Sequence, residues 1–329
     1  NVFFLNPPSG HSSLNHTDFK NLTSVNYSGF PKGLRFCPGV LQRFFIRKMF
    51  DAIQDLCKVN IDIVWSFDNS VFFDFSALRS EVFKVSHIVD LNQDFQTRKA
   101  ASTADFCLCT TELIKKRLLK FNPRVFKINH GFNSYTSSDA VVKLPGKSKL
   151  KALYSGNLAM PFIDWVLIHN IVKENLAVDF VFVGPNQDVF GGDLQQNRAK
   201  QAVLALSNSF LIGKVESRVL LSYLVAANIL LVAYQEKYHM DQSNPHKMME
   251  YLGSGRMVVA TNTSEFRELH SQLILMSNKN AELPSLFKKA VDEIDFWNCD
   301  EKREFRISFA MDNAYDRQID RIEQILKLK

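Results

Sequence analysis

The sequence lacks any long hydrophobic segment. Its longest apolar stretch, residues 219–234, is interrupted by Ser222 and Asn228 and is too short and too polar to span a bilayer. No signal peptide is visible. Glycine and proline are scarce, with 13 and 10 residues, which argues against low-complexity linkers. These absences, in a chain of 329 residues, predict a cytoplasmic globular protein of about two domains.

Metal-binding and dinucleotide-binding motifs are also missing. The five cysteines are scattered, and only Cys107 and Cys109 lie close together, with no second pair or histidine cluster to complete a zinc site. The sequence has no Asp-x-Asp motif, and no Gly-x-Gly-x-x-Gly follows a predicted strand. We therefore expect buried, reduced thiols, no metal and no cofactor, and we rank a dinucleotide-dependent oxidoreductase low.

The charge of the chain changes sign along its length. Residues 1–151 contain 21 Lys and Arg against 12 Asp and Glu, a net charge of +9, whereas the remainder has a net charge of −3. A basic first half suggests an anionic partner there, such as a membrane surface or lipid phosphate. Nucleic acid is not favoured, because the aromatic and basic residues gather around a predicted helix rather than on a sheet.

That helix includes residues 41–50 and can be interpreted in two ways. Arg43 and Arg47 lie four residues apart on one face, with Phe45, Ile46 and Met49 on neighbouring faces. Such an amphipathic basic helix can lie on an anionic bilayer. A helix that packs into the core and leaves a basic stripe in solvent has the same pattern, and the sequence leaves both interpretations open.

Strands and helices alternate along the whole chain, which is typical of βαβ units and parallel sheets. Residues 9–38 have no clear period and are predicted to form a long functional or mobile loop, and the polar stretch 134–148 is predicted to be the interdomain linker. In the first half the expected strands are 2–6, 62–67, 84–90, 106–109 and 125–128, and the expected helices are 40–57, 71–80 and 110–121. In the second half the expected strands are 150–155, 180–183, 210–212, 229–233, 257–261 and 273–276, and the expected helices are 162–174, 194–207, 217–227, 245–252 and a tail from about residue 302.

Three strands of the second half are followed directly by glycine, at Gly156, Gly184 and Gly213. In doubly wound sheets, ligands bind outside the carboxyl ends of the strands. Glycine lets the backbone approach a ligand closely, so these positions favour a backbone-lined pocket. Ordinary turns between strand and helix are the alternative.

The segment after residue 242 is the most informative. Ser243 or Asn244 can cap a helix with Pro245 at its first position, and such a helix start can bind an anion. Lys247 lies in the first turn, an unfavourable place for a cation unless an anion such as a diphosphate binds there. Glu250, one turn later, can accept hydrogen bonds from ribose hydroxyls. The alternative is a solvated Lys247–Glu250 surface pair.

Several segments together resemble one family. In the second half they are Tyr-Ser-Gly-Asn-Leu (154–158), Phe-Val-Phe-Val-Gly-Pro (180–185), Ile-Gly-Lys-Val (212–215), the element from Ser243 to Gly255, and Val-Val-Ala-Thr (258–261). In the first half residues 62–67, 103–112 and 128–133 fit the same family, and residues 309–317 resemble its helix that crosses back to the first domain. The sequence is similar to GT-B glycosyltransferases of group 1 (family 4), with some resemblance to bacterial membrane-associated glucuronosyltransferases.

The resemblance implies an α/β protein with two doubly wound Rossmann-like domains facing a cleft. The acceptor-binding domain would cover residues 1–146, the nucleotide-sugar domain residues 147–308, and the crossing helix residues 309–329. The family's first strand–helix unit is expected to be missing before Asn1, since residues 2–6 resemble its second strand. The nucleotide and its diphosphate would be held by Gly156, Asn157, Gly184, Lys214, Val215, Ser243, Asn244, Lys247 and Glu250.

Candidate groups for the sugar and the acceptor follow from the same resemblance. Asp90 ends a predicted strand where the family has a residue facing the cleft, and is a candidate catalytic base, with a helix cap as the alternative. Trp65 and His130 are expected on the acceptor side, whereas His87 is expected to be a satisfied core residue. Gln242 stands where the family has the first of two glutamates, so the donor sugar would meet an uncharged amide.

The sequence thus predicts a glycosyltransferase that moves a sugar from a UDP-sugar to a hydroxyl of a glycan or lipid-linked acceptor. The resemblance implies a role in bacterial surface polysaccharide synthesis, retention of configuration, and peripheral contact with an anionic membrane at the inner face of the cell membrane. Two alternatives stay open: a GT-B-shaped nucleotide-sugar epimerase, and a degenerate binding module, which the uncharged Gln242 keeps in consideration.

Overall fold

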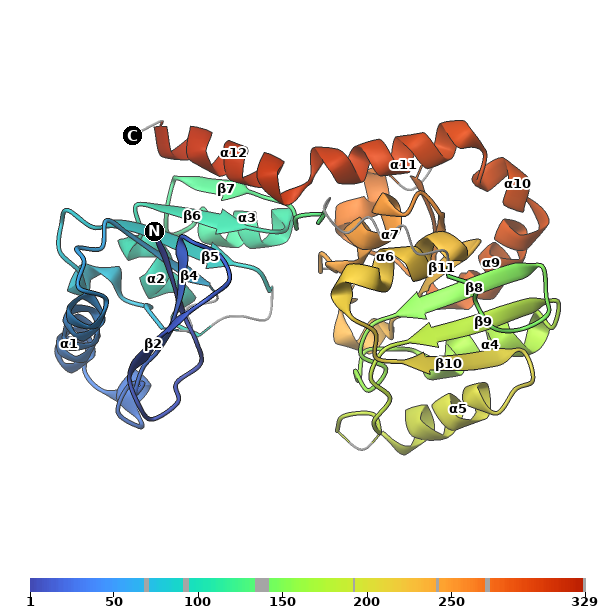
Figure 1. The fold of residues 1–329 in the computed structure, drawn as a ribbon, viewed down its shortest axis with the longest axis horizontal. Coiled ribbons are helices and arrows are strands. Elements are labelled where there is room, and N and C mark those ends of the chain that lie inside the picture. The colour runs from blue at the N-terminus through green and yellow to red at the C-terminus, as the bar shows by residue number, and fades with distance from the viewer. Residues whose placement is uncertain are drawn as a thin grey trace. The chain divides into compact units, whose positions relative to one another are not determined.

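The computed structural model describes residues 1–67, 71–90, 95–133, 142–191, 193–240, 243–269 and 273–327. The chain forms two compact units, Asn1–Ile128 and Asn129–Lys329, which are coloured blue to green and green to red in Figure 1. The domain limits expected at residues 146 and 308 stay predictions, and much of the expected linker lies outside the described residues.

A four-stranded parallel sheet forms the centre of the first unit. Its strands are β4 (Ile63–Phe67), β5 (Phe83–Ile88), β6 (Phe106–Cys109) and β7 (Val125–Lys127), in the order β4-β5-β6-β7. All four residues of β6 are buried, as expected for an internal strand of a parallel sheet. The four expected strands are therefore confirmed, with ends shifted by one or two residues.

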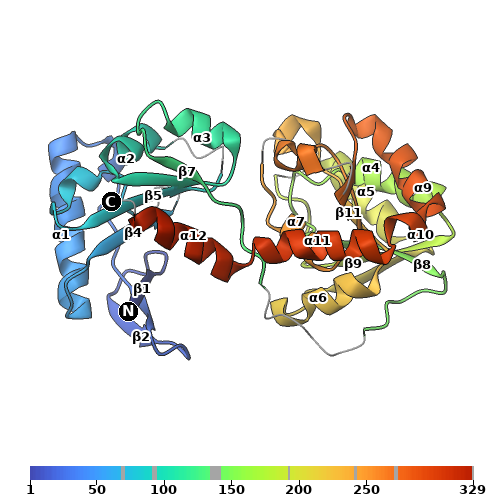
Figure 2. The same cartoon turned by 90° about the horizontal axis from the view of Figure 1, so that it is seen from above.

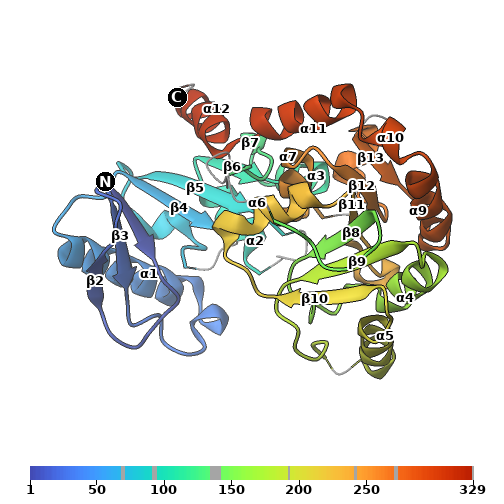
Figure 3. The ribbon, with the colours of Figure 1, turned by 45° about the vertical axis from the view of Figure 1, so that its right-hand side comes forward.

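A second, smaller sheet occupies the region that was predicted to be a loop. Strands β1 (Val2–Leu5), β2 (Ser13–His16) and β3 (Leu22–Asn26) pair in the order β1-β3-β2, beside helix α1 (Gly39–Cys57) (Figure 3). The prediction of a loop over residues 9–38 is wrong because side-chain hydrogen bonds support these short polar strands. The Asn6 amide donates to Ser24 Oγ at 2.7 Å and to Asn26 Oδ1 at 2.8 Å.

Helix α1 packs its apolar face into the first unit. Ile46, Phe50 and Ile53 are buried in the same cluster as Val64 of β4. The helix expected over residues 71–80 is wrong, since the structure has only a 3-10 turn there, Phe75–Ala77, capped by the Asp74 carboxylate. Two short helices follow, α2 (Thr97–Thr103), which was not predicted, and α3 (Glu112–Leu118).

The second unit contains a six-stranded, fully parallel sheet. Its strands are β8 (Leu150–Ser155), β9 (Val178–Val183), β10 (Ser209–Gly213), β11 (Ile229–Val232), β12 (Met257–Ala260) and β13 (Ile274–Met276). Their order, β10-β9-β8-β11-β12-β13, is that of a doubly wound nucleotide-binding sheet, in which the strand order reverses between β8 and β11. The expected doubly wound domain is confirmed.

Helices cover both faces of this sheet (Figure 1). Alternate residues of β9 point into two separate clusters, with Phe180 and Phe182 on one face and Val181 and Val183 on the other. The helices on the first face are α4 (Trp165–Glu174), α5 (Leu194–Leu204) and α9 (Leu283–Asp292), and those on the second are α6 (Ser217–Ala226) and α7 (Lys247–Gly253). Burial on both faces explains the continuous apolar character of these strands.

The chain ends in helices α10 (Ile294–Trp297), α11 (Asp300–Asp312) and α12 (Tyr315–Lys327). Figure 2 shows α11 lying along α7, against which it packs. The fully buried Arg306 of α11 fixes this arrangement by donating hydrogen bonds to the carbonyls of Leu273, Gly255 and Trp297. Among the described helices, none combines the length and the apolar character that a bilayer crossing requires.

Candidate functional site

Three glycines lie side by side at the carboxyl edge of the second sheet. The Gly156 amide donates to Val183 O at 2.9 Å, and the Gly184 amide donates to Gly213 O at 2.8 Å. Gly184 has φ of +144°, and a Cβ atom there would lie 1.8 Å from Gly156 O. No other residue fits at this position, so this edge is lined by backbone, as the strand-end glycines predicted.

The ammonium of Lys247 lies beside Gly156, where the strand order reverses. Its Nζ donates to Ser155 O at 2.7 Å, lies 3.9 Å from the ring centre of Tyr154 and is 3.1 Å from where a Cβ of residue 156 would stand. Tyr234, which follows β11, presents its ring at 5.6 Å. The solvated surface pair with Glu250 is therefore not what the structure contains.

Burial makes this ammonium unusually ready to accept an anion. Removal from water lowers the pKa of Lys247 to about 7, and the nearby charge of Glu250 only partly opposes this. Ser155 O is the hydrogen-bond acceptor that holds Nζ here, and an ammonium has three donors. An anion at this edge of the sheet would compensate the buried charge and raise the pKa again.

Three tyrosines that were not singled out from the sequence hold this arrangement in place. The buried hydroxyl of Tyr251 accepts a hydrogen bond from the Ser155 amide at 2.9 Å and so fixes the end of β8 immediately before Gly156. Tyr154 and Tyr234 are also buried, and burial raises the pKa of each. A tyrosine directly after Glu250 in the motif was the available signal for Tyr251.

Glu250 lies on α7, partly buried, one turn after Lys247. Burial raises the pKa of its carboxyl, although the charges of His246 and Lys247 act in the opposite direction. Its Oε1 lies 3.9 Å from His246 Nδ1. The carboxylate thus lies beside His246 at the start of α7 and remains partly open to solvent.

His130 joins this cluster from the segment that opens the second unit. Its ring is perpendicular to that of His246, with 5.5 Å between ring centres, and His246 Nε2 lies 3.0 Å from the hydroxyl of Tyr315. Burial and then the charge of His246 lower the pKa of His130 to about 4, so it is neutral at pH 7. Residue 131 must be glycine, since a Cβ there would lie 2.2 Å from the Tyr315 ring. The structure thus places His130 in the second unit, beside His246 at the start of α7.

The start of α7 differs from the prediction. The helix begins at Lys247, with His246 as N-cap and no side-chain cap, so neither Ser243 nor Asn244 caps it. The reason is local: Ser243 Oγ donates instead to Met240 O at 2.6 Å, and Asn244 is buried. Gln242, the candidate for the donor sugar, lies outside the described residues.

The other nucleotide candidates occupy the loops after β8 and β10. Asn157 Oδ1 accepts a hydrogen bond from the Ala159 amide at 3.0 Å, which closes the turn after Gly156. Lys214 is exposed and Val215 is partly buried, directly after Gly213. These residues lie at the same sheet edge as Lys247, because β8, β9 and β10 are parallel neighbours.

Asp90, Trp65 and His87 belong to the first unit. Asp90 is exposed, two residues after the end of β5. Trp65 is 39% exposed on β4, stacks on Phe67 with 5.5 Å between ring centres, and donates its indole N–H to His87 Nδ1 at 3.3 Å. His87 is buried and accepts this bond at Nδ1, so its expected position in the core is confirmed.

Neither metal ligands nor reactive thiols stand out in the described part of the chain. It contains no group of three His, Cys, Asp or Glu side chains that could hold a metal ion. Cys57, Cys107 and Cys109 are buried, reduced thiols, and burial raises the pKa of Cys107 to about 12. Cys37 and Cys299 are free but only partly buried, so the prediction of burial is wrong for these two.

Solved structures with a similar fold cover nearly the whole chain, although no family model and no curated protein matches the sequence. Sucrose-phosphate synthase from Thermosynechococcus elongatus superimposes with a TM-score of 0.71 at 11% identity, covering 99% of this chain and 88% of that one. HepE of Anabaena, solved in complex with UDP, gives a TM-score of 0.66 at 14% identity, covering 89% and 85%. The UDP-forming α,α-trehalose-phosphate synthase from Burkholderia xenovorans gives 0.67 at 10% identity, covering 99% and 93%.

At identities this low, the structural similarity establishes the fold alone. The relationship to group 1 or to the glucuronosyltransferases stays a prediction. Three observations agree. The chain has two Rossmann-like units, the strands β8 to β13 of the second follow the order 3-2-1-4-5-6 when numbered along the chain, and these neighbours cover nearly the whole chain. The chain therefore has the GT-B fold.

Proposed function

We propose that this protein is a glycosyltransferase that uses a UDP-sugar as donor. The observation that carries the proposal is the Lys247 ammonium, desolvated beside Gly156 at the point where the strand order reverses. A ligand with two phosphates would meet this cation and an edge of backbone that glycine leaves open. The HepE structure with UDP and the UDP-forming synthase support the choice of nucleotide.

The chain's own residues would act mainly by stabilising the leaving group. As the bond between the sugar and the diphosphate breaks, negative charge grows on the diphosphate, and a preorganised cation in a water-poor site stabilises it strongly. Lys247 would supply this charge, with amides of the glycine edge and the residues Asn157, Ser243, Asn244, Lys214 and Val215 around it. Glu250 would hold the ribose hydroxyls, and Gln242 the donor sugar. No residue in this account requires a metal or a cofactor.

The acceptor is proposed to be a hydroxyl of a glycan or a lipid-linked sugar in bacterial surface polysaccharide synthesis, at the inner face of the membrane. Trp65 and His130 are proposed for its side of the reaction. By the group 1 resemblance we favour retention, with the departing diphosphate taking the acceptor proton. Asp90 would then orient the acceptor rather than act as the base.

Calorimetric titration with UDP tests the nucleotide site. Lys247→Met should weaken UDP by about 1.5–3 kcal/mol, the range for hydrogen bonds to charged groups. Lys200→Met is the matched control: Lys200 is a buried lysine of the second unit, on α5 rather than α7, and it donates to Gln187 O in the loop before α5. Equal affinities of wild type and Lys247→Met would refute the nucleotide site. UDP binding without any transfer or hydrolysis of UDP-sugars would instead identify a degenerate binding module.

A further inference from the structure

Large apolar side chains are exposed together where helix α1 begins. Phe36 is 79% exposed, Val40 69%, Leu41 47% and Phe44 59%. Val40 and Leu41 lie four and three residues before Phe44, so both neighbour it on the surface of the first two turns of α1. Phe36 lies four residues before Val40, at the end of the 3-10 turn Leu34–Phe36. We call these four residues, together with the cations Arg35, Arg43, Arg98 and Lys99, the α1-start surface.

This surface is distinct from the helix face that packs into the protein. Ile46, Phe50 and Ile53 of α1 are buried in the core, and Phe45 and Met49 are partly buried. The apolar residues that were expected to meet a bilayer therefore serve mostly the core, whereas those that remain exposed lie one turn earlier. Several large apolar side chains exposed next to one another usually mark an interaction site.

Cations surround the exposed side chains. Residues 19–50 contain six Lys and Arg and no Asp or Glu. The Arg35 guanidinium lies over the rings of Phe36, at 4.8 Å, and Phe95, at 5.8 Å. Arg43, 45% exposed, is 3.9 Å from the buried carboxylate of Asp74, which offsets part of its charge.

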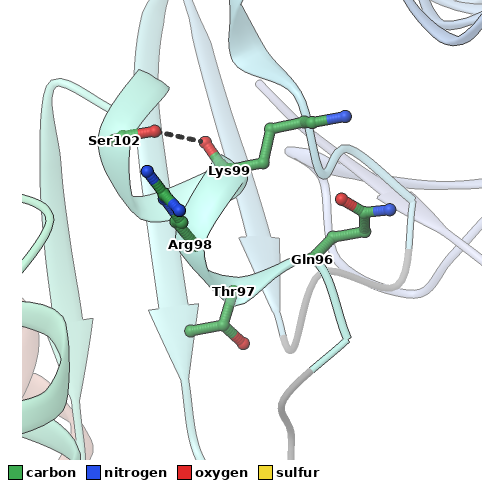
Figure 4. Close-up of a pocket in the computed structure, with 5 residues that line it drawn as sticks. All are labelled: Gln96, Thr97, Arg98, Lys99 and Ser102. Carbon is green, nitrogen blue, oxygen red and sulfur yellow. Dashed lines mark hydrogen bonds between the residues drawn. The ribbon is translucent and has the colours of Figure 1, made fainter. Parts of the chain in front are cut away.

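The α1-start surface continues onto helix α2. Buried Gln42 donates to the carbonyls of Leu34 and Arg35 and accepts a hydrogen bond from Lys99 Nζ at 2.6 Å. These bonds hold the start of α1 against the start of α2. Lys99 and Arg98 line a cavity of about 410 Å³ on α2, with the further lining residues Gln96, Thr97 and Ser102 (Figure 4). Lys99 is thus tied to the start of α1, and Arg98 is its neighbour on α2.

We propose that the α1-start surface docks on an anionic lipid bilayer. The exposed Phe and aliphatic side chains would enter the interfacial region while Arg35, Arg43, Arg98 and Lys99 meet lipid phosphates. Nucleic acid fits less well, since bases stack on aromatic rings along a basic groove, and Val40 and Leu41 offer no such platform. This deepens the proposed function, on which it rests for its purpose: presenting the enzyme to a lipid-linked acceptor.

Co-sedimentation with vesicles tests the proposal without requiring catalysis. Wild type should sediment with vesicles of phosphatidylcholine and phosphatidylglycerol, and not with phosphatidylcholine alone. Arg35→Ser/Arg98→Ser should lower partitioning about 30-fold, since each basic residue near an anionic surface is worth about fivefold. Phe36→Ser/Phe44→Ser should lower it by about tenfold or more through lost apolar insertion. Binding should weaken as salt rises.

Matched controls on α3 and in the turn directly after it separate docking from general charge and hydrophobicity. Leu113 and Leu119 are exposed apolar residues of the first unit, and Lys116 and Lys120 are exposed cations beside them. Leu113→Ser/Leu119→Ser and Lys116→Ser/Lys120→Ser should leave vesicle binding unchanged. Losses equal to those of the α1-start variants, or no binding by wild type, would overturn the proposal.

An inserted fluorophore gives a readout that does not depend on loss of binding. Phe44→Trp should show a blue-shifted emission on adding anionic vesicles, whereas Leu113→Trp should not. Self-association of the free protein that Phe36→Ser/Phe44→Ser abolishes would instead assign the surface to a second copy and refute membrane docking. UDP titration of each variant separates a failed nucleotide site from a failed membrane surface.

Discussion

The two units differ in what lines the carboxyl ends of their strands. In the second unit, β8, β9 and β10 end at glycine, and the partly buried ammonium of Lys247 lies beside this backbone. In the first unit, side chains occupy this edge. Exposed Phe67 is the last residue of β4, and exposed Asp90 follows β5. A backbone-lined edge suits a phosphate ligand common to many enzymes, whereas side chains can be varied to recognise a particular acceptor.

Net charge also differs between the units, but it does not mark the proposed diphosphate site. Residues 1–128 contain 17 Lys and Arg against 11 Asp and Glu, a net charge of +6, whereas residues 129–329 contain 23 of each. The cation proposed to bind the diphosphate thus lies in the unit without net charge. Net charge describes long-range attraction to a surface. Affinity for one anion depends instead on a single desolvated charge, which composition does not reveal.

The largest expected effect comes from closing the glycine edge. Gly184→Ala should destabilise the protein by about 3 kcal/mol or more, because its Cβ would collide with Gly156 O at a φ that side chains rarely adopt. Gly191→Ala is the matched control: its φ is +84° but nothing lies within 4 Å, so it should cost about 1–2 kcal/mol. Thermal unfolding measures both, and equal shifts would contradict the close approach of the two strand ends.

The next effect is the proton linkage of Lys247. Its pKa of about 7 in the free protein should rise when UDP binds, so binding should take up a proton near pH 7 to 8. UDP affinity should then fall by up to about tenfold per pH unit above 7, until the pKa of the bound state is reached. Calorimetry in buffers of different ionisation enthalpy measures the uptake, which Lys247→Met should abolish.

The same linkage has a consequence for folding. The lysine pKa is lower in the folded chain than in the unfolded one, so the unfolded state binds more protons between pH 7 and the ordinary lysine pKa of 10.5. The contribution of Lys247 to stability therefore rises with pH across that window. Lys247→Met should raise the melting temperature most at pH 7 and below, and a lower melting temperature there would contradict the burial of the charge.

A smaller effect is expected at Glu250. Glu250→Ala should weaken UDP by roughly 1.5 kcal/mol, the lower end of the range for hydrogen bonds to a charged group, but should hardly change binding of a 2′,3′-dideoxy analogue. The comparison of the two ligands isolates the ribose hydroxyls. Equal losses for both would mean that Glu250 supports the cluster with His246 rather than the ligand.

The smallest effect is expected in the first unit, at Asp90. With retention, Asp90→Asn should lower turnover by less than about tenfold and leave UDP affinity unchanged, because the diphosphate takes the proton. A general base would cost about 10²–10⁴-fold and would accompany inversion. The anomer of the product, determined by NMR together with the rate of the variant, distinguishes the two.

Sequence patterns predicted the apolar strands well, and they predicted short polar strands and 3-10 turns poorly. Every strand of the second sheet was expected within two residues, since buried parallel strands are continuous apolar runs. The strands β2 and β3 were missed because their residues are polar and are supported by Asn6 from a distant position. The prediction of a helix around Phe75 is wrong. The phenylalanines of this region fill the core without the periodicity of a helix.

By itself, the sequence determined the order of strands and helices, the strand-end glycines and the short element that holds Lys247 and Glu250. These features are local, and a residue's neighbours in the chain suffice to produce them. Only the tertiary structure decided that Lys247 is desolvated against Tyr154, that Tyr251 fixes Ser155, and that the exposed phenylalanines lie at the start of α1. These depend on contacts between residues dozens of positions apart, and burial, which sets both the pKa of Lys247 and the exposure of Phe36, exists only once those contacts form.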